Sequence, residues 1–184
     1  MKYGLILPLA LAFALTISTC AFAQAAGGFL GVTAKVTVKA RAEKIYETIR
    51  SLRNDEESGV TEIARTATEA TLEERFDGLP IIGHAKCVYI ERYSPPERIE
   101  YKMVHSDRFK AFEGKWEIVP VGGGDVCVLS LSSYVDTGLP IPFARQITNA
   151  ATMRDVEQRL SEVKQKAETL RREVSTRSPG QANR

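Results

Sequence analysis

Residues 143–174 read FARQITNAATMRDVEQRLSEVKQKAETLRREV. Apolar side chains recur in this stretch at three- and four-residue spacing, which places them along one face of a helix, while Arg, Glu, Lys and Gln fill the opposite face. The apolar positions are Ile147, Ala150, Met153, Val156, Leu160, Val163, Ala167, Leu170 and Val174. The spacing therefore predicts one long amphipathic helix near the end of the chain.

The chain before this helix is a series of short runs in which apolar and polar side chains alternate. Such alternation predicts half-buried strands. Strands are expected at residues 32–38, 60–65, 68–76, 84–93, 98–105, 109–119 and 126–135, and a short helix at 42–52. This order predicts an α+β fold, in which a curved, mostly antiparallel sheet of about seven strands has the helices on its concave side.

The first residues have the features of an export signal. Lys2 supplies positive charge, residues 5–23 form an apolar run, and Ala21-Phe22-Ala23 is a small-x-small cleavage motif before Gln24. These features predict a cleavable signal peptide at residues 1–23 and a periplasmic or secreted mature protein. Two alternatives are that the run stays in place as a membrane anchor, or that Cys20 carries a lipid.

The rest of the chain is expected to form one domain. Residues 24–31 are a linker of small residues, residues 32–174 form the domain, and residues 175–184 have little to bury and are predicted to be disordered. Lys and Arg number 25 and Asp and Glu 23, and the two signs alternate along the last helix. The sequence therefore predicts no nucleic-acid partner and, after signal cleavage, no stable membrane insertion.

Two cysteines, Cys87 and Cys127, lie inside expected strands of the mature chain. An oxidising compartment would permit a disulfide between them. The expected topology places their strands three steps apart, which is about 14 Å at the usual strand spacing. Bridged Cα atoms need to lie within about 7 Å of each other. Two buried free thiols are therefore favoured over a disulfide.

No set of residues with an obvious catalytic or metal-binding pattern is present. The histidines, His84 and His105, lie at strand edges and are expected to be exposed, and Cys87 follows His84 at an odd spacing that separates them onto opposite strand faces. The carboxylates that could serve in acid–base chemistry are Glu91, Glu100, Glu113 and Asp136. Glu100 and Glu113 fall on the polar phase of their strands. The sequence thus predicts no catalytic residue, no metal site and no cofactor.

The apolar phase of three successive strands faces the long helix and supplies a candidate ligand-binding site. The predicted ligand-binding residues are Ile99, Tyr101, Met103, Phe112, Trp116, Ile118, Leu129 and Leu131 on the strands, and Ile147 and Met153 on the helix. The alternative is that these large side chains fill the space and leave a dense core. Gly114, between Phe112 and Trp116, favours a cavity because it removes one side chain from this face.

Three stretches resemble the START/Bet v 1-like superfamily, also called the SRPBCC or polyketide cyclase/dehydrase-like group. They are VTVKARAEKIY at 36–46, FDGLPI at 76–81 and FKAFEGKWEI at 109–118. The third is similar to the Phe-Lys-x-Leu-x-Gly-x-Trp run of coenzyme Q-binding relatives. The resemblance, which spans about residues 33–170, implies a helix-grip fold, in which the sheet wraps around the long C-terminal helix.

Together, the residues and the resemblance predict an exported binding protein for a hydrophobic small molecule of the lipid, isoprenoid or quinone class. A distant similarity to MxaD-like proteins implies an alternative, in which the chain is a periplasmic accessory protein acting through protein–protein contact. The candidate contact would be the end of the long helix, with Leu170 and Val174. A less favoured alternative is a cyclase- or aromatase-type enzyme that uses the same cavity.

Overall fold

The computed structural model describes residues 31–55 and 58–177 of the 184-residue chain. The elements are β1 (Val32–Val38), α1 (Ala42–Arg53), β2 (Val60–Arg65), β3 (Glu69–Leu79), β4 (Gly83–Ser94), β5 (Arg98–Ser106), β6 (Ala111–Val121), β7 (Val126–Asp136) and α2 (Ala144–Arg177). Their order is the one predicted. The predicted signal peptide, the linker up to residue 30 and the predicted tail from residue 178 onward lie outside the described residues.

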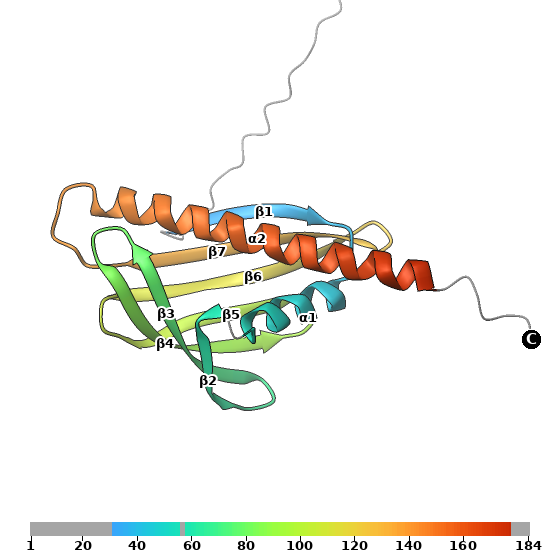
Figure 1. Ribbon diagram of the computed structural model, residues 1–184, viewed down its shortest axis with the longest axis horizontal. Helices are drawn as coiled ribbons and strands as arrows, with labels where there is room; N and C mark the ends of the chain where they lie inside the picture. The colour runs from blue at the N-terminus through green and yellow to red at the C-terminus, as the bar shows by residue number, and fades with distance from the viewer. Residues whose placement is uncertain (1–30, 56–57, 178–184) are drawn as a thin grey trace, which may run out of the picture.

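The strands form one antiparallel sheet of seven strands in the order β1-β7-β6-β5-β4-β3-β2. Figure 1 shows α2 lying along β1 and β7, with α1 beside it on the same face of the sheet. The β3–β4 hairpin curves up towards the first turns of α2 in the same view. The predicted α+β helix-grip fold is therefore confirmed. Within the described residues, no helix has both the length and the apolar character needed to span a bilayer.

The turn between β3 and β4 lies later in the chain than predicted. The sequence predicted that this strand ends at residue 76, directly before Asp77-Gly78, but β3 continues to Leu79 and the chain reverses after it, at Pro80–Ile82. Gly78 has a φ of +67°, and the β3–β4 register shifts between Phe76 and Leu79. An Asp-Gly pair suits a bulge as well as a two-residue turn, because both need a residue at positive φ.

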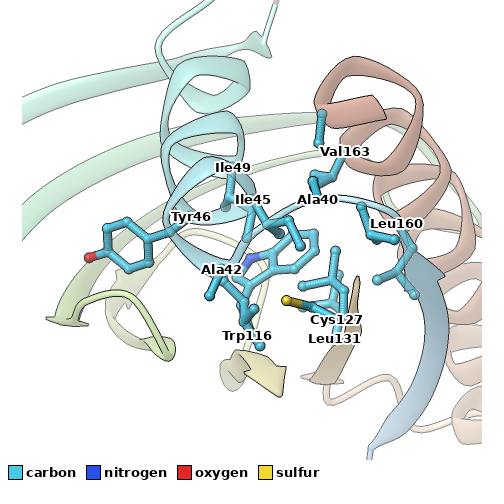
Figure 2. Packing of buried hydrophobic residues seen from close by; sticks show 14 of the residues in the cluster. Ala40, Ala42, Ile45, Tyr46, Ile49, Trp116, Cys127, Leu131, Leu160 and Val163 are labelled. Atoms are coloured by element: carbon cyan, nitrogen blue, oxygen red, sulfur yellow. The ribbon is translucent and has the colours of Figure 1, made fainter. Parts of the chain in front are cut away.

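One half of the interior is a dense apolar core between β1, β6, β7 and both helices. Figure 2 shows the Trp116 ring inside this cluster, with Ile45 and Ile49 approaching from α1 and Leu160 and Val163 from α2. All of these side chains are buried. The contribution of α2 continues at three- and four-residue spacing, as expected for a helix that packs along one seam.

The other half of the interior has a different composition. Its cluster combines Leu72 of β3 and Tyr89 of β4 with Phe109 and Phe112, at and just before the start of β6. Among the described residues, this cluster contains no side chain of either helix. The sheet and α2 are therefore less tightly packed together here than around Trp116.

Cys87 and Cys127 are both buried and both free, as the sequence favoured. They lie on β4 and β7, which β5 and β6 separate in the sheet. Burial, together with the Glu74 and Asp107 carboxylates, raises the pKa of the Cys87 thiol to about 12. Cys87 therefore stays protonated near neutral pH and acts as a small apolar side chain.

Candidate functional site

A cavity of about 360 Å³ lies between the sheet and the first half of α2. Its sheet side is lined by Phe76, Phe109 and Phe112, and its helix side by small side chains that include Ala151 and Thr152. We call this space the aromatic lobe. Its size falls within the range of small-molecule pockets, which typically measure about 300–1,000 Å³.

The rings of the aromatic lobe are fixed by contacts with one another. The Phe112 centroid lies 4.9–6.2 Å from the ring centroids of Phe76, Tyr89, Tyr101 and Phe109. The Phe76 ring meets both Phe109 and Phe112 edge-to-face, at interplanar angles of 69° and 72°. Edge-to-face pairs are favourable geometries for aromatic side chains. The lobe therefore has a rigid apolar wall.

A second cavity of about 460 Å³ adjoins the aromatic lobe, and we call it the polar lobe. Its apolar lining includes Leu52 of α1, Trp116 of β6 and Val163 of α2, while Arg53 and Glu91 supply charge. Ser58, Asp155 and Arg159 line both lobes. The two lobes therefore meet at these three residues.

A buried carboxylate on β3 holds Arg159 at this junction. Glu74 is only 3 % exposed. Its Oε1 accepts a hydrogen bond from Arg159 Nη2 at 2.7 Å, and its Oε2 accepts one from the Tyr89 hydroxyl at 2.9 Å. Asp155, one helical turn before Arg159, pairs with Arg159 Nε at 2.9 Å. Two carboxylates thus share one guanidinium.

The charged state of this cluster follows from its contacts. Burial disfavours a charged guanidinium, but Glu74 and Asp155 outweigh that effect and hold the pKa of Arg159 above its ordinary value. Burial and the neighbouring Glu74 carboxylate also raise the pKa of the Tyr89 phenol. Arg159 is therefore charged and Tyr89 is a neutral donor near neutral pH.

A second buried ion pair closes the polar lobe at the end of α1. Arg53 Nη1 donates to Glu91 Oε2 and to the Tyr93 hydroxyl, the latter at 2.6 Å, and Tyr93 donates to Glu91 at 3.0 Å. The Arg53 and Glu91 side chains are 8 % and 10 % exposed. Burial raises the pKa of Glu91, and Arg53 opposes the rise. The pair links the last turn of α1 to β4.

The lining of the two lobes carries more acidic than basic residues. The acidic residues are Glu74, Asp77, Asp155, Asp55, Glu91 and Glu162, and the basic residues are Arg53, Arg75 and Arg159. The cavity is therefore apolar on its aromatic wall and mixed elsewhere, with an excess of acidic residues.

The predicted strand residues divide between the dense core and the cavity. Ile99, Ile118, Leu129 and Leu131 are at most 2 % exposed and pack in the dense core around Trp116, so the predicted alternative of a filled interior describes that half of the molecule. Of the predicted strand residues, Phe112 lines the aromatic lobe and Trp116 the polar lobe.

Tyr101 and Met103 are half-buried and border a separate depression beside the end of the β5–β6 pairing. The space above Gly114, which was expected to favour a cavity, is occupied. A Cβ on Gly114 would lie 2.1 Å from the Ser132 carbonyl oxygen and 2.4 Å from the Tyr101 hydroxyl oxygen. Gly114 therefore permits close packing on the side where a Cβ would lie, although it also borders the separate depression.

The predicted helix residues do not line either lobe. Ile147 is 38 % exposed and Met153 is half-buried, whereas Thr148, Ala151 and Thr152 line the aromatic lobe. The physical reason is the phase of α2. The well-packed seam of Val156, Leu160, Val163 and Ala167 continues backwards at four-residue spacing through Thr152 and Thr148, which places Ile147 on the exposed side. The side chains of Leu170 and Val174 lie outside those described.

Sequence reasoning missed the residues that give the site its polarity, above all Glu74 and Arg159. A signal was present on β3, where Ala70, Leu72, Glu74 and Phe76 share one strand phase and Glu74 is the charged member of an inward-facing row. Burying a charged side chain at such a position is unfavourable unless the charge has a partner, so the pattern indicates a buried ion pair.

The histidines are exposed, as expected, and His84 Nδ1 lies 2.6 Å from Asp77 Oδ1. Within residues 31–55 and 58–177, no group of His, Cys, Asp and Glu is arranged to hold a metal ion. Glu100 is exposed and Glu113 half-buried on the outer phase, while Asp136 accepts from the Gly138 amide at 2.7 Å. Of the four carboxylates that the sequence suggested for acid–base chemistry, Glu91 is the one that lines the cavity.

The curved sheet, the long C-terminal helix and the cavity between them define a helix-grip protein. The sequence model of the family described as polyketide cyclase / dehydrase and lipid transport matches residues 30–168. The chain belongs to this family. No curated protein matches its sequence.

Solved structures of low sequence identity share the fold. The Thermus thermophilus protein TTHA0849 is 18% identical with a TM-score of 0.62, and the match covers 76% of this chain and 97% of that one. The Zhui aromatase/cyclase from Streptomyces is 17% identical with a TM-score of 0.62, covering 74% and 92%. A START superfamily protein from Mycobacterium smegmatis is 21% identical with a TM-score of 0.51, covering 76% and 97%.

Proposed function

We propose that this protein is an exported binding protein that holds a hydrophobic small molecule, of the lipid, isoprenoid or quinone class, in the aromatic lobe. The observation that carries the proposal is the pair of walls that enclose this space. Phenylalanine rings form one wall, and α2 places the small side chains of Thr148, Ala151 and Thr152 opposite them. An apolar molecule could enter this space without displacing the dense core around Trp116.

The size of the ligand follows from an energy comparison. Burying about 400 Å² of apolar ligand surface is favourable by about 10 kcal/mol. Association itself opposes binding by about 4–15 kcal/mol. A small apolar molecule would therefore bind weakly, whereas a lipid- or quinone-sized molecule that extends from the aromatic into the polar lobe would bind usefully.

A cyclase- or aromatase-type enzyme would need a buried group that moves protons. The two buried carboxylates of the cavity each accept a hydrogen bond from a guanidinium, Glu74 from Arg159 and Glu91 from Arg53. A proton placed on either carboxylate would weaken its ion pair with that guanidinium. The geometry therefore supports binding better than proton transfer. The accessory role through a protein partner stays a prediction from the sequence.

Bound ligand can be tested on the purified protein by native mass spectrometry and organic extraction. We expect an apolar molecule to copurify with the wild type. Ala151→Phe, which places a ring into the aromatic lobe, should lower its occupancy at least about tenfold because the ring takes the ligand's space. Ala150 is exposed on the same helix, so Ala150→Phe is a matched control that should keep the ligand.

The result against the proposal is equally clear. If no apolar molecule were recovered from the wild-type protein, and none could be added back, the proposed binding function would lose its main support. Equal occupancy in Ala151→Phe and Ala150→Phe would move the binding site away from the aromatic lobe.

Export can be tested independently of ligand binding. We expect the mature protein to begin at Gln24 and to be recovered from the periplasm or the medium, because Ala21-Phe22-Ala23 precedes that residue. Intact-mass measurement of fractionated cells gives the N-terminus directly. Protein that retains Met1 in the membrane fraction would indicate an anchor instead, and a lipid mass on Cys20 would indicate a lipoprotein.

A further inference from the structure

Arg159 is the basic side chain that the two lobes share, and part of it faces the cavity. Its side chain is 37 % exposed and lines both lobes. Nε pairs with Asp155 and Nη2 donates to Glu74, but Nη1 donates to no other described residue. A guanidinium has five N–H donors in a fixed planar fork. Arg159 therefore keeps donors for a ligand.

The fork is held in place by a chain of hydrogen bonds. Tyr89 donates to one oxygen of Glu74, and the other oxygen accepts from Arg159. Glu74 and Tyr89 are both buried. Because its two oxygens have separate partners, the Glu74 carboxylate fixes the orientation of Arg159 from the sheet side, while Asp155 fixes it from α2.

The charges around Arg159 determine which polar group it can accept. Two carboxylates, Glu74 and Asp155, oppose one guanidinium, so the cluster carries an excess of one negative charge. An anionic ligand group would be repelled by this excess, and the repulsion is stronger beside the buried Glu74 carboxylate than it would be in bulk water. A neutral oxygen could accept a hydrogen bond from Nη1 without that repulsion.

We infer that the ligand of this cavity is neutral and carries an acceptor oxygen, such as a ketone, ester or quinone carbonyl, which accepts a hydrogen bond from Arg159. Glu74 and Asp155 act as a charge filter that excludes fatty-acid carboxylates. The inference rests on the proposed binding function and adds to it the polar group that the cavity selects. Arg159 is the specificity-determining residue, and Glu74 and Asp155 set the charge around it.

The inference can be tested with four probes that share a chain of eleven carbons: methyl nonyl ketone, undecanoic acid, undecylamine and undecane. Displacement of a fluorescent hydrophobic dye at about pH 7.5, where the acid is ionised and the amine protonated, ranks their affinities. For the wild type we expect the ketone to bind about tenfold more tightly than undecane, since one charge-assisted hydrogen bond is gained. Undecanoic acid should bind more weakly than undecane.

Three variants change the charges around the cavity-facing guanidinium. Glu74→Gln removes one carboxylate, and Glu74→Gln with Asp155→Asn removes both. We expect each step to raise the affinity for undecanoic acid at least roughly tenfold. Glu74→Gln with Arg159→Met removes the guanidinium without leaving a buried carboxylate unpaired, and should erase the preference for the ketone over undecane. Glu157→Gln, at an exposed position of α2, is the control and should match the wild type.

The possible results separate this inference from the proposed function. The charge filter would be overturned if undecanoic acid bound the wild type as tightly as the ketone. It would also be overturned if removing both carboxylates left the affinity for undecanoic acid unchanged. Undecylamine as the tightest probe would overturn it too, because the acidic lining would then select a cation. If none of the four probes bound, undecane included, the binding function itself would fall, and the charge filter with it.

Discussion

Replacing Arg53 by alanine is expected to lower the free energy of unfolding by about 3–5 kcal/mol, because it leaves the buried Glu91 carboxylate without its charged partner. The Arg53 side chain is 8 % exposed and joins the end of α1 to β4. Urea unfolding at neutral pH, followed by the fluorescence of the single tryptophan, Trp116, measures the loss. Trp116 lies in the dense core and reports on global unfolding.

The loss of unfolding free energy caused by Arg53→Ala should grow as the pH rises from acid to neutral. Burial already raises the pKa of Glu91 above the ordinary value of 4.5, and without Arg53 the rise becomes larger. Between the ordinary and the raised pKa, the folded protein holds a proton that the unfolded chain releases, so stability falls as pH rises through that interval. The difference in unfolding free energy between Arg53→Ala and the wild type should therefore be smallest at a pH below the ordinary pKa of glutamate and largest at neutral pH.

Arg65→Ala provides the matched control. Arg65 pairs with Glu62, and both side chains are about one-third exposed. Exposed ion pairs contribute about 0–1 kcal/mol, so this variant should stay close to wild type. A loss in Arg53→Ala no larger than that in Arg65→Ala, or a loss that does not shrink in acid, would contradict a structural role for the buried pair.

Gly114→Ala is expected to destabilise the protein by about 3 kcal/mol or more, although it adds a single methyl group. The new Cβ would lie 2.1 Å from the backbone oxygen of Ser132 and 2.4 Å from the Tyr101 hydroxyl oxygen. The tyrosine could rotate away, but the carbonyl belongs to β7 and can move only with that strand. The same urea titration measures the effect.

Gly123→Ala tests whether the effect of Gly114→Ala is steric. A Cβ on Gly123, in the β6–β7 hairpin, would meet nothing within 4 Å. We expect its free energy of unfolding to stay within about 0.5 kcal/mol of wild type. If Gly114→Ala were equally mild, β6 and β7 would be less closely spaced at this point than the structure indicates.

The fold could be predicted from the sequence because most strands keep a two-residue alternation and the C-terminal half of α2 keeps a clear seam. The first half of α2 is ambiguous, since Ile147, Ala150, Ala151 and Met153 point around more than one side of the helix. The pattern alone cannot select the inward side there. The packing of the second half of the helix selects it, and brings Ala151 and Thr148 to the cavity.

The site was only partly predictable, because its decisive contact joins residues far apart in the chain. Glu74 and Arg159 are separated by 85 residues. The inward phase of β3 marks Glu74 as unusual, but nothing local to Arg159 distinguishes it from the other charged residues of α2. Which arginine reaches Glu74 depends on how the β3–β4 hairpin curves towards α2, and alternation along a strand carries no information about that curvature.

The division of the interior into a packed half and a hollow half has a consequence for how such a chain can diversify. A mutation that resizes Ala151 alters a wall that borders empty space, so it should be tolerated far better than mutations beside Trp116. The preferred ligand can therefore change during evolution while the fold is retained. Proteins of this architecture could exchange one guest for another through few substitutions, without first acquiring extra stability.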